Sequence, residues 1–278
     1  MFAFIAAISQ VGGILIDKII LTRRQVETRV YIPILFLFLA ILTAILYPFI
    51  GSVQSGFFQL KYIAIFIVML FVAIFWNIFY YRGVQAEKVH EYEMIIMFQP
   101  LLTILLAALF LKGERNIHII IIALIASIAL IFSHLKKAHL EVSAGSKSLI
   151  VATILMSAEL ILLKELLNVF SPVALYFFRT GIIFIFFYLF YRPQVNKIAS
   201  TNLWLILATS FLGVAQMVSK FYGFDKYGVV YTSLVLILSP VLVYLLSTIF
   251  LHERLKARAV ISFLIILACI GYATIFGK

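Results

Sequence analysis

Ten apolar segments of about 20 residues follow one another along this chain, and most of the connections between them are short. About 20 consecutive apolar residues is the length that an α-helix needs to cross the hydrocarbon core of a bilayer. Hydrophobic residues make up 65% of the 278 residues and charged residues 12%, which is more apolar surface than a soluble domain needs. The sequence therefore predicts an all-α polytopic membrane protein with ten transmembrane helices, at roughly 2–21, 30–50, 60–80, 91–111, 117–135, 149–168, 172–191, 202–222, 228–251 and 257–276.

The net charge of +11 comes from Lys and Arg in a chain that is predicted to span a membrane. Lys and Arg lie mostly between the apolar segments, where they anchor the topology and contact anionic headgroups. No nucleic-acid-binding pattern accompanies them, so nucleic acid is not an expected partner. The single cysteine, Cys269, lies in the last apolar segment and is expected to pack there. The expected location is the inner or plasma membrane.

One sequence pattern occurs twice, 140 residues apart. Gly83–Leu111 and Gly223–Leu251 share eight identical positions at this offset, and the scarce residues among them, Gly83/Gly223 and Pro100/Pro240, are the most informative. The polar stretch 136–148 separates the helices five and five, so the expected units are 1–135 and 149–278. Because five crossings are an odd number, the second unit must start from the opposite side of the membrane. The pattern therefore predicts two inverted five-helix repeats, an arrangement that supports alternating access in transporters.

Glu159 and Arg179 are ionisable residues inside predicted spans. A carboxylate at the depth of Glu159 is costly in a bilayer unless it faces a cavity or a partner, by about 2.5–3.5 kcal/mol on insertion scales. We expect Glu159 either to bind a proton or a cationic substrate group, or to form a structural ion pair with Arg179. Arg179, in turn, is expected either to bind a carboxylate or phosphate of the substrate, or to pair with Glu159 or extend to the interface.

Pro100 and Pro240 fall in the middle of equivalent helices. Each proline removes a backbone donor and clashes with the carbonyl four residues earlier, so both helices are predicted to kink. The preceding residues, Gln99 and Ser239, are polar and also equivalent. Irregular backbone at membrane depth is tolerated where it lines a cavity or is buried in protein. Two symmetric kinks therefore indicate that these residues flank the site.

Other polar or aromatic residues in the spans could line a substrate path. Trp76 and Asn77 lie late in the third segment, and the position equivalent to Trp76 in the eighth segment is Gln216. The alternative for Trp76 is anchoring at the headgroup level, where Trp is enriched. Gln10 lies in the first segment beside two glycines that permit close helix packing.

Enzyme signatures are missing from the sequence. Its five histidines lie near loops, and no Cys or carboxylate set completes a metal site around them. The sequence contains no phosphate-binding loop, no nucleophile elbow and no zinc-protease motif. We therefore expect neither an enzyme nor a cofactor or metal.

At these residues the chain resembles the ten-helix, EamA-type members of the drug/metabolite transporter superfamily. The resemblance rests on an aromatic stretch, a mid-helix proline and a Leu-x-x-Glu-Arg-like helix end in both halves, namely Phe79-Tyr80-Tyr81, Pro100 and Leu111-Lys112-Gly113-Glu114-Arg115, and Phe221-Tyr222-Gly223, Pro240 and Leu251-His252-Glu253-Arg254. Val173–Arg179 also resembles the second-helix pattern of the family. The resemblance implies a central cavity lined by helices one, three, four, six, eight and nine. It also implies cytoplasmic termini, whereas the excess of Lys and Arg in the odd-numbered loops favours termini outside, so the orientation stays open.

The expected function is secondary transport of a small metabolite by alternating access, as an exporter or exchanger, with a proton or a counter-substrate as the coupling species. Glu159 would be the coupling or counter-charge residue. The alternative is a translocator of a lipid-linked or phosphate-bearing substrate, in which Arg179 would carry the recognition. Besides the bilayer, a small solute is the expected partner.

Overall fold

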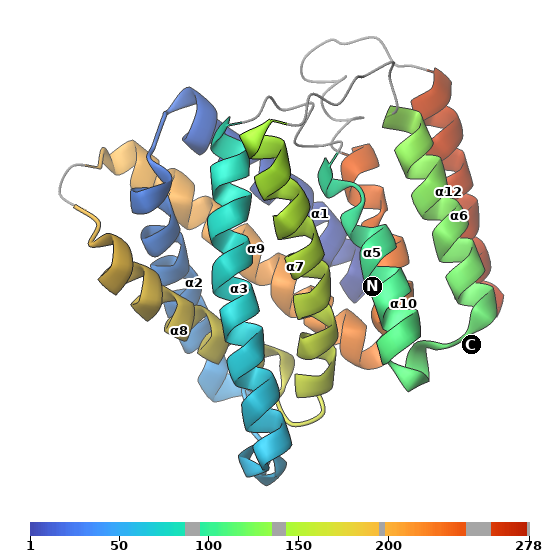
Figure 1. Ribbon diagram of the computed structural model, residues 1–278, viewed down its shortest axis with the longest axis horizontal. Coiled ribbons are helices and arrows are strands. Elements are labelled where there is room, and N and C mark those ends of the chain that lie inside the picture. The colour runs from blue at the N-terminus through green and yellow to red at the C-terminus, as the bar shows by residue number, and fades with distance from the viewer. Residues whose placement is uncertain (87–94, 135–142, 195–197, 243–256, 277–278) are drawn as a thin grey trace.

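The computed structural model describes the chain except for residues 87–94, 135–142, 195–197, 243–256 and 277–278. Ten α-helices account for most of the described residues, which contain no β-strand (Figure 1). Their bounds are α1 Phe2–Lys18, α2 Thr28–Ile50, α3 Leu60–Ala86, α5 Gln99–Phe110, α6 Ile117–His134, α7 Ala144–Leu166, α8 Pro172–Tyr191, α9 Ser200–Tyr227, α10 Val229–Leu236 and α12 Ala257–Phe276. The all-α prediction is thereby confirmed for the described part of the chain. Most of the predicted linker, and the second Leu-x-x-Glu-Arg-like motif at 251–254, lie outside it.

Local sequence explains where the helices α7 and α8 begin. The Ser143 hydroxyl accepts a hydrogen bond from the Ser146 backbone N–H at 3.0 Å, and the Ser171 hydroxyl accepts one from Ala174 at 3.3 Å. Serine is favoured at such positions because its oxygen satisfies a donor that the first turn leaves unpaired. In α8 the next residue is Pro172, which suits the first helical position because it has no N–H to satisfy.

Five helices are long and apolar enough to cross a membrane: α1 with its extension to Leu21, α2, α3, α8 and α9. Four shorter apolar helices lie at Gln99–Phe110, Ile117–Ile131, Val229–Leu242 and Val260–Phe276 among the described residues. Large apolar side chains such as Phe49 and Phe211 point outward and are mostly exposed. An outer surface of this kind is suited to lipid rather than to water.

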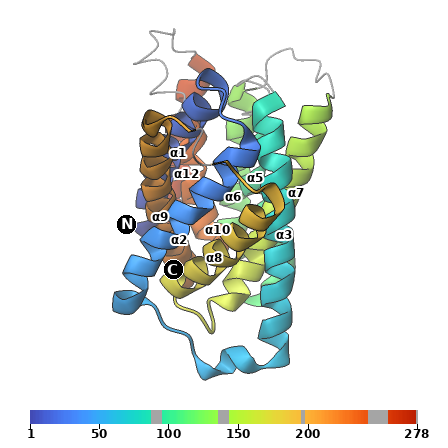
Figure 2. The same ribbon diagram turned by 90° about the vertical axis from the view of Figure 1, so that its left-hand side faces the viewer.

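Successive helices run in alternating directions, as Figure 1 shows, so α7 runs opposite to α1. The closest helix contacts join the two halves of the chain: α3 packs along α7, α1 along α9, α2 along α8 and α6 along α12. Suppose that α1, α2 and α3 of the first half are equivalent to α7, α8 and α9 of the second half. The α3–α7 pair is then equivalent to the α1–α9 pair, and the α2–α8 pair is formed by two equivalent helices. Figure 2 shows the tilted α2 and α8 together on one side of the molecule.

The helical segments that lead to Pro100 and Pro240 are interrupted at equivalent positions. Helical residues 95–96 are followed by a turn at 97–98 before α5 begins, and α10 ends at Leu236 with a turn at Ile237 before the helix resumes at 238. Each interruption begins three residues before its proline, at positions 140 residues apart. At the first interruption Phe98 N donates to Ile95 O, three residues earlier, at 3.2 Å. At the second, Ile237 N is shared between Ser233 O at 3.1 Å and Leu234 O at 3.3 Å.

A carboxylate from the first half of the chain caps α10 in the second half. Glu114 accepts hydrogen bonds from the backbone N–H groups of Val229 at 2.7 Å and Val230 at 3.1 Å. Negative charge at this end also complements the helix dipole. The cap depends on Gly228, which has φ +87° and ψ 167°. A Cβ at Gly228 would lie 2.6 Å from both Glu114 carboxylate oxygens.

We predict that Gly228→Ala destabilises the protein by about 1–3 kcal/mol, because this backbone region is accessible essentially only to glycine and the new Cβ displaces the Glu114 carboxylate. Thermal unfolding of the purified protein in detergent measures the change. The control is Gly181→Ala in α8, where a Cβ meets nothing within 4 Å. This variant should be neutral or slightly more stable. Equal stability of the two variants would show that the cap is not formed as described.

Candidate functional site

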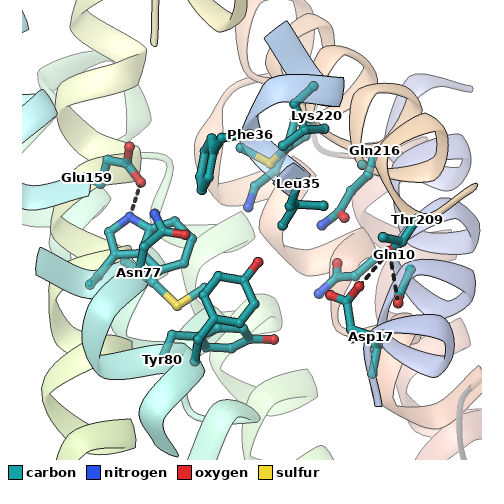
Figure 3. A pocket seen from close by; sticks show the side chains of 18 of the residues that line it. Gln10, Asp17, Leu35, Phe36, Asn77, Tyr80, Glu159, Thr209, Gln216 and Lys220 are labelled. Carbon is teal, nitrogen blue, oxygen red and sulfur yellow. Dashed lines mark hydrogen bonds between the residues drawn. The ribbon is translucent and has the colours of Figure 1, made fainter. Parts of the chain in front are cut away.

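A cavity of about 160 Å³ lies in the middle of the helix bundle. It is bounded by α1, α2, α3, α7, α8 and α9, with Gln99 at the start of α5. Figure 3 shows Asn77, Tyr80 and Glu159 on the wall formed by α3 and α7, and Gln10, Asp17, Thr209 and Gln216 on the facing wall formed by α1 and α9. The two walls are therefore the two helix pairs that join the halves of the chain.

The helices that line the cavity differ from those that the resemblance implies. Leu35, Phe36 and Leu39 of α2, and Tyr176 and Arg179 of α8, also line it. They reach the cavity because α2 and α8 pack against each other and close one side of it. The ninth predicted helix instead lines a smaller neighbouring pocket of about 30 Å³, through Ser233, Leu236 and Pro240.

Glu159 and Arg179 form a buried ion pair in the cavity wall, each only 2% exposed. Arg179 Nε donates to Glu159 Oε1 at 2.6 Å and its Nη2 donates to Oε2 at 3.2 Å. The indole N–H of Trp76 donates to the same Oε2 at 2.6 Å. The Arg179 guanidinium also lies 5.8 Å from the centre of the Trp76 ring. Three helices, α3, α7 and α8, thus meet at one carboxylate.

Glu159 therefore forms the ion pair with Arg179, which is one of its two expected roles. The bidentate contact fixes both oxygens, and the pair has no net charge. Arginine is suited to such a pair because its planar guanidinium matches a carboxylate with two parallel hydrogen bonds. A substrate or proton that uses either side chain must therefore compete with the partner that already holds it.

Asp17 is a second carboxylate on the opposite wall, and the sequence analysis did not single it out. Its Oδ1 accepts hydrogen bonds from the Tyr31 hydroxyl and the Thr209 hydroxyl, both at 2.6 Å. The Thr209 hydroxyl also lies 3.4 Å from the Gly13 carbonyl. Among the described residues no donor reaches Oδ2. Asp17 is thus held in place by neutral groups from α2 and α9.

Lys220 is the second residue that the sequence analysis missed. It is 6% exposed and lines both the cavity and the smaller pocket beside it. Its ammonium lies 5.7 Å from the centre of the Phe224 ring, and within the described ranges no carboxylate pairs with it. The rule that drew attention to Glu159, an ionisable residue inside an apolar segment, applies equally to Asp17 and Lys220.

The other predicted residues mostly reach the same cavity. Gln10, Gln99 and Gln216 line it together with Trp76 and Asn77. Asn77 is 1% exposed, and its amide nitrogen donates to the Ala73 carbonyl at 2.7 Å. Its Oδ1 is buried and has no hydrogen-bond donor in the part of the chain that the structure describes. A buried acceptor of this kind is costly unless a ligand or water satisfies it.

Ser239 and the two prolines lie beside the cavity rather than in its wall. The Ser239 hydroxyl contacts the Ala7 carbonyl at 3.3 Å and Gln10 Oε1 at 3.4 Å, which ties the helical segment after the break to α1. Pro100 and Pro240 line the smaller pocket, which shares Gln10, Gln99 and Lys220 with the main cavity.

Comparisons with known proteins agree with this architecture. Residues 144–275 match the model of the EamA-like transporter family. This match concerns the second half of the chain. A solved crystal structure superposes with a TM-score of 0.72 at 14% sequence identity, covering 97% of this chain and 97% of that chain, so the whole fold has a counterpart. No curated protein matches the sequence. The resemblance to EamA-type proteins is thereby confirmed, and the protein is a multi-pass integral membrane protein with a transporter domain of the drug/metabolite superfamily.

We predict strong coupling between Glu159 and Arg179 in a double-mutant cycle. Arg179→Gln leaves a buried carboxylate without its cation and should cost about 3–5 kcal/mol. Glu159→Gln combined with Arg179→Gln removes both charges and should cost clearly less than the sum of the single changes. Unfolding of the four proteins in one detergent measures the cycle. Additive effects would mean that the pair is not formed.

Proposed function

We propose that the protein is a secondary transporter that moves a small metabolite by alternating access, as an exporter or exchanger. In this proposal ten helices span the membrane as two inverted repeats, residues 1–135 and 149–278, joined by the linker 136–148. The alternating helix directions and the exchange of the α3–α7 pair with the α1–α9 pair support it. Rocking of the two helix pairs against each other would open the cavity to one side and then to the other.

The single observation that carries the proposal is the cavity between these pairs, which is mostly apolar and contains a few buried polar groups. Ligand sites are typically largely apolar clefts in which a few polar groups fix the orientation of the ligand. The cavity fits this description: aromatic and aliphatic side chains line most of it, and its polar groups come from both halves of the chain. The unpaired Asn77 Oδ1 offers an acceptor to a substrate donor.

In the proposed cycle, Glu159 and Arg179 exchange partners. Their pairing keeps the unloaded cavity neutral on this wall, and a substrate group of either sign can replace one member of the pair. A proton that neutralises Glu159 would likewise release Arg179. The coupling species is therefore a proton or a counter-substrate that competes for the pair.

Lys220 supports a second candidate, the translocation of a phosphate-bearing or lipid-linked substrate. Lysine binds phosphate as a point charge, and the buried ammonium of Lys220 has no carboxylate partner among the described residues. This candidate requires the cavity to open toward lipid or to admit a large headgroup. The small volume of about 160 Å³ favours a small soluble metabolite instead.

We predict that Glu159→Gln abolishes or strongly reduces solute-dependent transport in proteoliposomes, because the glutamine cannot hold Arg179 with a full charge. The assay uses a panel of amino acids, amines and sugars with an internal pH dye. Glu165→Gln is the control in the same helix, since among the described residues the Glu165 side chain makes only a long 3.5 Å contact with the exposed Lys61.

Three outcomes separate the alternatives. Proton movement that accompanies wild-type flux and is lost in Glu159→Gln supports proton coupling. Flux without proton movement supports exchange. Wild-type protein that carries none of these solutes but moves a phosphate-bearing lipid would contradict the metabolite proposal and support the second candidate.

A further inference from the structure

The two carboxylates of the cavity are held by equivalent sets of helices. Glu159 lies on α7 and receives donors from α8 and α3. Asp17 lies on α1 and receives donors from α2 and α9. In both cases the carboxylate is on the first helix of its half, one donor is on the second helix of the same half, and the other is on the third helix of the opposite half. The cavity therefore has two carboxylate positions of the same construction.

The donors differ in charge. Glu159 receives a guanidinium, which cancels its charge and occupies both oxygens. Asp17 receives two neutral hydroxyls, and both donate to Oδ1. Among the described residues no donor contacts Oδ2, and Asp17 lines the cavity. In that part of the chain, no cationic side chain takes beside Asp17 the place that Arg179 takes beside Glu159.

A row of aromatic rings connects the two carboxylate positions. Trp76 and Tyr80 lie 5.9 Å apart between ring centres, Tyr80 and Tyr81 lie 5.0 Å apart, and Tyr81 and Tyr31 lie 5.4 Å apart. Tyr80 and Tyr81 line the cavity itself. Aromatic faces attract an organic cation through their quadrupole, and they add apolar contact with the rest of the molecule. A proton needs neither contribution.

We propose that Asp17 binds the ammonium group of a small organic cation or amphoteric solute, which makes it a substrate-binding residue of the cavity. The inference rests on the transport function proposed above and names the chemical class of its substrate. The volume of about 160 Å³ is close to that of a protein cavity known to hold one benzene ring, about 150 Å³. One aromatic or short aliphatic group with an ammonium therefore fits.

Lys220 limits where this cation can bind. Its ammonium enters the same cavity from α9, eleven residues after Thr209, which corresponds to about 16 Å along the helix axis. Like charges repel, so an ammonium is favoured at the Asp17 end and an acidic group at the Lys220 end. An amphoteric substrate would place its two charged groups accordingly.

The test compares benzylammonium with benzyl alcohol, which has nearly the same shape but no charge. Calorimetric titration of the full-length protein in detergent gives the two dissociation constants. Wild type should bind benzylammonium at least about tenfold more tightly than benzyl alcohol, and Asp17→Asn should remove this preference. The control is Asp225→Asn, because Asp225 is the other aspartate of the chain and is exposed on the same α9 that carries Thr209; it should keep the preference.

Tyr31→Phe provides a second variant that retains the charge. It removes one donor from Oδ1 and should keep the preference for the ammonium, even if Asp17→Asn does not fold. Equal affinities of wild type for the two probes, or a preference that survives in Asp17→Asn, would overturn the inference. Neither result would affect the transport proposal if the wild-type protein still carries solutes in proteoliposomes. If the wild-type protein carries no solute but prefers benzylammonium, the transport proposal is contradicted and the binding inference is not.

Discussion

A carboxylate and a guanidinium buried together where α3, α7 and α8 meet determine much of what this bundle can do. Either charge alone would be costly inside a membrane protein, so each residue requires the other or a ligand that replaces it. The indole N–H of Trp76 donates a third hydrogen bond to this carboxylate. These contacts join a helix from the first half of the chain to two helices from the second. Together with its Trp76 contact, the pair is therefore both a structural connection between the halves and the most polar feature of the cavity wall.

The other helices are also arranged in pairs that join the two halves of the chain. The α1–α9 pair faces the α3–α7 pair across the cavity, while α2 and α8 close one side and α6 and α12 pack together away from it. Contacts between the halves recur outside the cavity, because Glu114 of the first half caps α10 of the second. Within the second half, Lys164 of α7 donates to the Phe224 carbonyl of α9 at 2.6 Å and so joins the α3–α7 pair to the α1–α9 pair. Such polar contacts at one end of the bundle are of the kind that must break if the helices they join move apart there.

The sequence predicted the helices well because hydrophobic length and proline position are local properties. The range 172–191 coincides with α8, and the symmetric prolines pointed to the two interrupted helices. The partner of Glu159 was one of two alternatives, since sequence does not reveal which rotamer a buried arginine adopts. Asp17 escaped notice because it lies near the end of its apolar segment beside Lys18, where charges usually face the interface. It accepts a hydrogen bond from Thr209, which is 192 residues away, and no local pattern reveals such a contact.

In the proposed transport cycle, the cavity opens alternately to the two sides of the membrane. Gln216→Cys places a thiol in the cavity wall, in a background where the single native cysteine is removed by Cys269→Ser. Labelling with a membrane-impermeant thiol reagent, applied separately to each face of oriented proteoliposomes, measures its accessibility. Alternating access predicts that Gln216→Cys is modified from both faces. Phe211→Cys, on the exposed apolar side of the same helix, should react from neither. Modification of Gln216→Cys from one face only, with and without transported solute, would contradict alternating access.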